Sequence, residues 1–253
     1  MSAQGRSSIG IDIGSRTTKI VRIQDGAITD DMVFDTGNDP LTDVTAAMKR
    51  LDADAVVSTG YGRRLAQTHL SCRTVTEIRA CARGAGHLLP GCGSVIDIGG
   101  QDTKAIEMNG NAKFGRFEMN DRCAAGTGRF LEVMSLALGF SVADFGDEAL
   151  KADSPVLVSS MCTVFAESEV VSMIARGEDA RRISLGLHLS TARRVAAMAS
   201  RIEMGDTALF VGGVANNPCM VKLLREEVAC ELSVPERPEL AVAVGAALIG
   251  LDG

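Results

Sequence analysis

Asp97-Ile98-Gly99-Gly100-Gln101-Asp102-Thr103-Lys104 is the stretch that decides the fold, because the chain carries a second version of it, Asp12-Ile13-Gly14-Ser15-Arg16-Thr17-Thr18-Lys19. Each copy reads Asp-Ile-Gly, then three variable residues, then Thr-Lys, and each lies between two short apolar runs. That pattern predicts a strand, a tight turn and a second strand. The glycine lets the turn bring backbone N–H groups close to an anion, and an aspartate at the strand end can bind a cation.

One such hairpin would be weak support for a binding site, because tight turns need these residues for steric reasons alone. Two copies with matched spacing instead predict two similar half-domains that close on one nucleotide from opposite sides. Pro90 to Ser94 is the candidate boundary, directly before the second copy. We therefore expect an α/β protein with lobe I over residues 1–92 and lobe II over residues 93–239. The C-terminal helix, residues 240–253, is expected to pack back onto lobe I.

Composition narrows the class of partner. The chain has 253 residues, 26 basic and 32 acidic, and shows no basic run, which argues against nucleic acid. Its longest apolar run, Ala241 to Leu251, is about half the roughly 20 residues of a membrane-spanning helix. Met1 to Ser8 lacks the apolar segment of a secretory signal. We predict a cytoplasmic protein without a membrane partner, in which seven cysteines are thiols rather than a disulfide framework.

The remaining elements follow from periodicity and turn residues. Strands are predicted over residues 27–34, 56–60, 113–119, 156–158 and 208–211. Helices are predicted over residues 42–51, 77–87, 183–202, 219–228 and 241–251. Two further helices begin close to Gly128 and Thr163 and end at Gly139 and Gly177.

Three strand-to-helix junctions carry the candidate chemistry. Gly126-Thr127-Gly128 opens a helix, where unpaired N–H groups and the positive dipole end favour phosphate. Gly212-Gly213 lies between a strand and a helix and lets a flat ring approach the backbone, so it is the predicted adenosine site. Cys123 and Cys162 each lie beside a helix N-terminus, whose positive end favours an anionic sulfur.

Four interpretations of Cys123 and Cys162 remain open at this point. They are inert core thiols, a cysteine nucleophile, a zinc site and an iron–sulfur cluster. No histidine lies near either motif, which disfavours a nucleophile, and a tetrahedral zinc site would lack two of its usual four ligands. An iron–sulfur cluster also needs four thiolates, which two subunits related by a twofold axis would supply.

A known family contains all of these motifs together. The matching stretches are Ile11 to Lys19, Thr59 to Arg63, Val95 to Lys104, Met119 to Phe130, Ser159 to Val171, Gly212 to Ala215 and Val244 to Leu248. They span nearly the whole chain and resemble the ATP-dependent activators of 2-hydroxyacyl-CoA dehydratases, also called archerases. These activators are relatives of the ATP-binding subunits of benzoyl-CoA reductase. The resemblance implies the duplicated two-lobe fold of the acetate and sugar kinase, heat-shock ATPase and actin superfamily.

The resemblance also implies the cofactors and partners. It implies a homodimer bridged by one 4Fe–4S cluster, with Cys123 and Cys162 as each subunit's ligands. ATP would lie between the lobes, with Mg²⁺ near Asp12 and Asp97. The family takes one electron from ferredoxin or flavodoxin and delivers it, with ATP hydrolysis, to a partner iron–sulfur dehydratase or reductase.

The resulting set of candidate residues has three parts. The catalytic candidates are Asp12, Asp97 and Gln101. The nucleotide-binding candidates are Ser15, Arg16, Thr17, Thr18, Lys19, Gly99, Gly100, Gln101, Gly126, Thr127, Gly128, Gly212, Gly213 and Glu239. The metal ligands are Cys123 and Cys162.

Two positions depart from the family pattern. Arg16 stands where relatives usually carry a small residue, and the segment that begins at Glu239 lacks the Gln and Gly that many relatives show there. Three rival functions remain, of which one is an ATP-dependent reductase of another iron–sulfur protein. A small-molecule kinase of the same superfamily would need a catalytic base, for which Asp121 is the nearest candidate. A nucleotide sensor or scaffold would need no chemistry at all.

Overall fold

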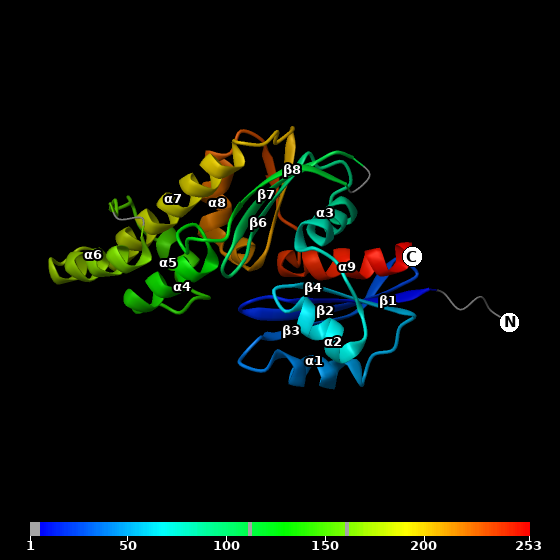
Figure 1. Cartoon of the computed structure of the whole chain (residues 1–253). Coiled ribbons are helices and arrows are strands. Elements are labelled where there is room, and N and C mark those ends of the chain that lie inside the picture. The colour runs from blue at the N-terminus through cyan, green and yellow to red at the C-terminus, as the bar shows by residue number, and fades with distance from the viewer. Residues whose placement is uncertain (1–5, 111–112, 160–161) are drawn as a thin grey trace.

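Two five-stranded mixed sheets with the same strand order form the framework of the protein. The computed structural model describes residues 6–110, 113–159 and 162–253. The first sheet has the order β3-β2-β1-β4-β5, and the second has the matching order β8-β7-β6-β9-β10. In each sheet the first three strands along the chain are antiparallel neighbours. The two later strands run parallel to the first of them, which is β1 in one sheet and β6 in the other. Figure 1 shows the two sheets as separate layers.

The elements have the following bounds. The strands of the first sheet are β1 (Ser7–Ile13), β2 (Thr17–Gln24), β3 (Ala27–Asp35), β4 (Ala55–Gly60) and β5 (Arg73–Thr74). Those of the second are β6 (Ser94–Ile98), β7 (Thr103–Met108), β8 (Phe114–Asn120), β9 (Thr207–Val211) and β10 (Glu231–Ser233). The helices are α1 (Pro40–Met48), α2 (Arg63–Leu70), α3 (Glu77–Leu88), α4 (Gly128–Ala137), α5 (Phe145–Leu150), α6 (Thr163–Ala175), α7 (Ala180–Ala199), α8 (Pro218–Glu227) and α9 (Ala241–Asp252). Two short 3-10 turns, η1 (Gly213–Asn216) and η2 (Pro238–Leu240), flank the last strand of the second sheet.

The two copies of the repeated sequence form equivalent hairpins. In β1 and β2, Asp12 is the register partner of Lys19, and in β6 and β7, Asp97 is the register partner of Lys104. The strand–turn–strand prediction is therefore confirmed in both copies. Each aspartate lies at the carboxyl end of a central strand, where ligands bind open α/β sheets.

The last helix of each half lies between the sheets (Figure 1). Helix α9 packs against β1, β2 and β4 of the first sheet and against α3. Small residues make this contact possible, since a side chain at Gly245 would collide with the carbonyl oxygen of Ala80. The tight packing predicted for residues 241–251 is confirmed, and the division into lobes at residues 92 and 239 stays a prediction.

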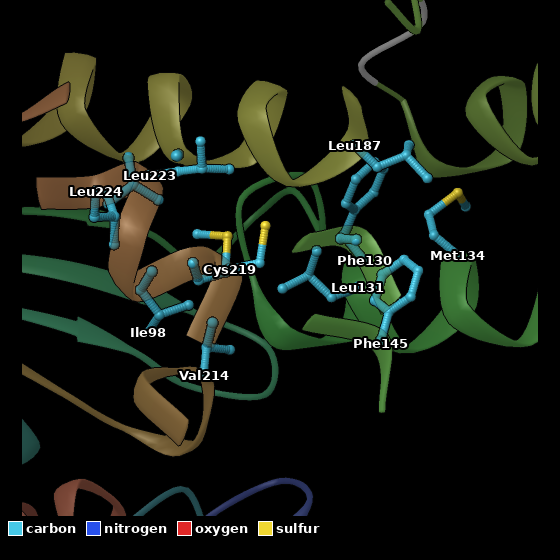
Figure 2. Close-up of a cluster of buried hydrophobic side chains, with 14 of the residues drawn as sticks. Ile98, Phe130, Leu131, Met134, Phe145, Leu187, Val214, Cys219, Leu223 and Leu224 are labelled. Carbon is cyan, nitrogen blue, oxygen red and sulfur yellow. The ribbon is translucent and has the colours of Figure 1, made fainter. Parts of the chain in front are cut away.

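Lobe II has the larger core and carries the extra helices α4 to α7 between its third and fourth strands. Figure 2 shows part of this core, in which Phe130 and Leu131 of α4 gather with Phe145, Leu187 of α7 and Cys219 of α8. Four cysteines are buried: Cys72, Cys81, Cys92 and Cys219. No disulfide joins any of the seven cysteines.

The strand predicted over residues 156–158 is wrong. This segment is irregular, and its backbone is bound to α7 through the Val156 N–H, which donates to the carbonyl of Arg182 at 2.9 Å. Val156 and Val158 pack against the core of lobe II, while Leu157 between them is 70% exposed. The neighbouring motif residues Ser160 and Met161 lie outside the described residues, as do Met1 to Gly5 of the predicted N-terminal segment.

The other predicted strands and helices are present, with ends shifted by a few residues. Side-chain caps explain two of the helix starts. Asp179 accepts from the Arg181 N–H at the start of α7, and Asn217 accepts from the Met220 N–H at the start of α8. Within the described ranges, no helix has the length and apolar character to cross a membrane.

Candidate functional site

The first hairpin turn presents Ser15 and Arg16 at its tip. The Gly14 N–H donates to the carbonyl of Thr17 at 3.1 Å, which closes the turn. Thr36, directly after β3, supports it by donating its N–H to the carbonyl of Arg16 and its hydroxyl to that of Gly14. On the strands below the turn, Lys19 Nζ lies 3.2 Å from Asp12 Oδ2.

The second hairpin has the same closure, with the Gly99 N–H donating to the carbonyl of Asp102 at 2.9 Å. Its lysine has a denser environment. Lys104 Nζ lies 2.8 Å from Asp102 Oδ2, 3.1 Å from Glu77 Oε1 and 3.4 Å from Asp97 Oδ2, and its side chain is 2% exposed. Glu77 is the first residue of α3, so Lys104 ties the second hairpin to a helix of the first half.

Charge and burial shift the pKa values of Lys104 and of two of its acidic neighbours, Glu77 and Asp102. Burial raises the pKa of Glu77 to about 7, opposed by Lys104 and reinforced by Asp12, Asp102 and Asp97. Burial also raises the pKa of Asp102. For Lys104 burial acts in the opposite sense, but the carboxylates of Asp97, Glu77 and Asp102 outweigh it and raise its pKa well above the usual range. Strongly perturbed groups of this kind are typical of functional sites.

The residues present fit a divalent cation beside Asp12. This aspartate is 4% exposed, and its Oδ1 has no hydrogen-bond partner among the described residues. A buried carboxylate oxygen without a donor is costly unless something else binds it, and carboxylates are the ligands that Mg²⁺ prefers. Thr59, the register partner of Asp12 on β4, has a second buried oxygen without such a partner.

Glycines let the next strand approach both aspartates closely. Gly60 follows Thr59 with φ of 84°, and Gly212 directly follows β9 in lobe II with φ of 88°. A Cβ at either position would lie 2.5 Å from the Oδ1 atom of Asp12 or Asp97. The duplication therefore extends to the residue that borders each carboxylate.

Gly126-Thr127-Gly128 does not have the role that the sequence predicts for its N–H groups. The Gly128 and Arg129 N–H groups donate to the carbonyls of Gly99 and Gly100 at 2.9 and 2.8 Å, and the Thr127 N–H donates to Ala124. Those donors are paired, whereas we expected them to be free for a phosphate. They brace the second hairpin turn against α4, and the Thr103 hydroxyl adds a bond to the carbonyl of Gly126 at 2.6 Å.

Hydrogen bonds from Asn120 also hold the segment that contains Cys123. Asn120, the last residue of β8, donates from its Nδ2 atom to the carbonyls of Cys123 at 2.8 Å and Ala125 at 3.1 Å. Cys162 is the N-cap residue of α6, as predicted, and is the exposed one of the seven cysteines, while Cys123 is partly buried. Helices α4 and α6 pack against each other, so both cysteines precede helices of one group.

Among the described residues, Cys123 and Cys162 have no further cysteine or histidine grouped with them as metal ligands. The described residues include no group of three or more His, Cys, Asp or Glu side chains arranged to hold a metal ion. The donor set at Cys123 and Cys162 fits an iron–sulfur cluster in its chemistry, since both thiols precede helix N-termini and neither is sealed in the core. Two more thiolates would have to come from a second chain.

The predicted adenosine turn borders a cavity of about 670 Å³. Gly212 donates its N–H to the carbonyl of Pro238 at 3.0 Å, and Gly213 has open space where a side chain would be. Residues that line the cavity include Asn216, Lys222, Arg225, Val234 and Pro235. Glu239 lies at the same place, where it accepts from Asn216 Nδ2 at 3.2 Å and from Arg237 Nε at 2.6 Å.

The other candidate residues lie in the two hairpins, apart from Gly212, Gly213 and Glu239. Gln101 is exposed at the second turn, and Thr17 is partly buried at the first. Thr18 is buried, and its hydroxyl lies 3.0 Å from that of Thr36. Sequence reasoning missed Glu77, because an acidic residue in the first helical turn has the ordinary explanation of a favourable helix dipole.

Comparison with known proteins agrees with this geometry. The sequence model of the BadF/BadG/BcrA/BcrD ATPase family matches residues 9–250. The chain is 36% identical over 254 residues to the 2-hydroxyisocaproyl-CoA dehydratase activator of Clostridioides difficile, covering 97% of this chain and 95% of that one. It is 35% identical over 214 residues to a benzoyl-CoA reductase subunit of Thauera aromatica, covering 81% and 74% of the two chains.

Solved structures show the same relationship. The activator of the 2-hydroxyisocaproyl-CoA dehydratase from Clostridium difficile, with bound ADPNP, superposes with a TM-score of 0.89 at 36% identity, covering 97% of this chain and 94% of that one. A glucokinase of the ROK family from Streptomyces griseus superposes with a TM-score of 0.64 at 15% identity, covering 98% of this chain and 100% of that one, which shows the fold alone. The expected two-lobe fold of the actin-like ATPases is confirmed.

Proposed function

The chain belongs to the BadF/BadG/BcrA/BcrD ATPase family, and on this premise we propose that it is an ATP-dependent one-electron donor. Its acceptor is an iron–sulfur 2-hydroxyacyl-CoA dehydratase or a related CoA-thioester reductase. The close relatives named as a dehydratase activator and as part of benzoyl-CoA reductase support this class of partner. A cytoplasmic location suits the proposal, since all seven cysteines are free thiols.

ATP lies between the two hairpins in this proposal, with its adenosine at Gly212-Gly213 and the adjoining cavity. Asp12 and Asp97 face the phosphates from opposite lobes and hold Mg²⁺. The unpaired Asp12 Oδ1 and the ADPNP bound by the related activator both support this placement. Lys19 and Lys104 neutralise the carboxylates so that the site can accept an anionic substrate.

The proposed redox centre is shared by two copies of the chain. Cys123 and Cys162 of each copy supply the four thiolates of one 4Fe–4S cluster, which provides a one-electron couple when bound. The surface next to Cys162 suits a contact with a second copy, because Val164 and Phe165 are each 67% exposed in the first turn of α6. Exposed apolar residues continue along this helix at Val171 and Ile174.

The observation that most supports coupling is the brace at the start of α4. The carbonyls of Gly99 and Gly100, in the turn that faces the phosphates, bind the first N–H groups of α4. Asn120 then connects the same segment to Cys123. A movement of the second hairpin on ATP binding or hydrolysis therefore displaces the backbone next to a cluster ligand.

The proposed reaction couples the hydrolysis of ATP to the transfer of one electron. Water hydrolyses the bond between the β- and γ-phosphates of ATP, giving ADP and phosphate. A reduced ferredoxin or flavodoxin loses one electron, and the partner iron–sulfur enzyme gains it. A potential change of a few hundred millivolts corresponds to roughly 5–7 kcal/mol at about 59 mV per tenfold change in equilibrium.

The test is Cys162→Ala in protein purified without oxygen, with Cys230→Ala as the matched control. Cys230 is a partly buried thiol that follows α8, outside the proposed site. We expect wild type and the control to be brown dimers with about four irons per dimer, and Cys162→Ala to lose iron and sulfide. A Cys162→Ala protein with full iron and sulfide would refute the ligand assignment. A colourless wild type that phosphorylates hydroxyl substrates would favour the kinase instead.

A further inference from the structure

The tips of the two hairpins touch each other across the cleft. A Cβ placed on Gly100 would lie 2.7 Å from Arg16 Cγ and 3.3 Å from Ser15 Oγ. The Arg16 side chain therefore lies over the second turn, on the space that a glycine leaves open. Its guanidinium comes from lobe I and ends against lobe II.

Glu132 receives that guanidinium. Arg16 Nη2 lies 2.6 Å from Glu132 Oε1, in the second turn of α4. The Glu132 side chain is 14% exposed, and its other oxygen, Oε2, lies 3.0 Å from Arg129 Nη1. The carboxylate is thus fixed by its own helix through Arg129, and the Arg16 side chain, 52% exposed, can leave without stranding it.

We propose that Glu132 is a positioning residue that competes with the γ-phosphate for Arg16. Without ATP, the Glu132 carboxylate binds the guanidinium across the cleft; with ATP, the phosphate oxygens take its place and Arg16 turns to the nucleotide. This inference rests on the proposed ATP site between the hairpins. A guanidinium binds carboxylate and phosphate oxygens with the same planar pair of N–H groups, so the exchange replaces one anion with another.

The exchange has a direct consequence for α4. Glu132 lies three residues after Arg129, whose N–H binds the carbonyl of Gly100. When Arg16 is bound to Glu132, lobe I holds the helix whose start is braced by the phosphate turn. When the phosphate takes Arg16, that tie is released. Arg16 therefore reports the presence of the third phosphate to the helix that follows Cys123.

The test measures binding of Mg²⁺ with ADP and with a non-hydrolysable ATP analogue by calorimetry, on the full chain purified without oxygen. Glu132→Gln removes the competing charge, so it should bind the ATP analogue about two- to fivefold more tightly, the range of an exposed ion pair of up to about 1 kcal/mol. Arg16→Ala should weaken binding of the analogue by about five- to tenfold, because a charge-assisted bond to the phosphate is lost. ADP affinity should stay within twofold in both variants.

The double variant decides whether the two residues act together. If Glu132 acts through Arg16, adding Glu132→Gln to Arg16→Ala should change nothing further, whereas independent effects would add. Arg16→Lys should keep part of the analogue affinity, because it retains the charge. Asp252→Asn is the matched control, since it breaks the exposed pair of Arg83 and Asp252 at 2.9 Å, away from both hairpin tips.

Several outcomes would overturn the proposal. Weaker analogue binding by Glu132→Gln would mean that Glu132 aims Arg16 at the nucleotide rather than competing with it. Unchanged analogue affinity in either single variant, or equal changes for ADP and the analogue, would also refute the exchange. These results differ from failure of the proposed ATP site, in which wild type would bind neither nucleotide.

Discussion

Lys19 in the first hairpin meets one carboxylate, that of Asp12, while Lys104 in the second meets three, those of Asp97, Asp102 and Glu77. The backbones around them are equivalent in strand register, turn closure and the bordering glycine. The two copies therefore differ in charge rather than in shape. The second hairpin is therefore fixed by an internal ion cluster, while in the first a buried carboxylate oxygen, Asp12 Oδ1, has no partner among the described residues.

The largest expected effect is the loss of stability when the lysine of a hairpin is replaced, which should differ between Lys104 and Lys19. Lys104→Met would leave three carboxylates close together without their shared cation, and breaking a buried ion cluster in this way destabilises a protein by about 3–5 kcal/mol. Lys19→Met leaves one buried carboxylate, that of Asp12, without its partner, so we expect a loss at the lower end of that range, about 3 kcal/mol. Urea unfolding of the two variants side by side measures the difference. Equal losses of stability would show that the ion cluster does not distinguish the hairpins.

Acid should lower the stability of lobe II by protonating the buried imidazole of His188. His188 is fully buried on α7, its Nδ1 atom donates to the carbonyl of Ser184 at 2.8 Å, and its Nε2 atom accepts from Asn217 Nδ2 at 3.0 Å. Burial lowers its pKa to about 4, against a smaller raising by the bond to Ser184. Because the folded pKa lies below the unfolded value near 6.5, the stabilisation is complete above pH 6.5 and is lost as the pH falls towards 4.

Over that window the loss should reach roughly 3 kcal/mol. His188→Gln should unfold with a flatter pH dependence between 6.5 and 4, measured by urea titrations at several pH values. His87→Gln is the matched control, since His87 is exposed on α3. If the control flattened the profile as much as His188→Gln, the acid response would not belong to this lobe.

The sequence was sufficient for the hairpins and the fold, because the repeated motif is a local pattern whose strands, turns and glycines determine one another. It also located Cys162 at the start of α6, whereas Cys123 lies upstream of Thr127, the N-cap residue of α4. It failed for Gly126-Thr127-Gly128, because a helix start has free N–H groups only if no other part of the chain supplies carbonyls, and here Gly99 and Gly100 do. Glu77 was missed for the same reason, since its partner Lys104 lies 27 residues further along the chain.

The smallest expected effect concerns the residue beside each hairpin aspartate, Asp12 and Asp97. Thr59 is the register partner of Asp12, and Val211 holds the same position beside Asp97. Both are fully buried, and the Thr59 hydroxyl has no partner among the described residues. Replacing an unpaired buried hydroxyl with a methyl of similar shape is neutral or stabilising, so Thr59→Val should raise the free energy of unfolding by up to about 1 kcal/mol without ligand.

The reciprocal variant completes the comparison. Val211→Thr would place a buried hydroxyl beside Asp97, where the neighbouring strand was built for an apolar residue, and should destabilise the protein by about 1–3 kcal/mol. When Mg²⁺ and nucleotide are present, the Thr59 hydroxyl should favour binding. It and Asp12 Oδ1 are two oxygens of lobe I that are available to the cation and its bound water. Thr59→Val should then weaken nucleotide binding a few-fold in calorimetry while stabilising the free protein. If Thr59→Val left nucleotide affinity unchanged, the Thr59 hydroxyl would have no part in binding, and Asp12 Oδ1 would be the one unpaired oxygen of the pair left to bind the cation.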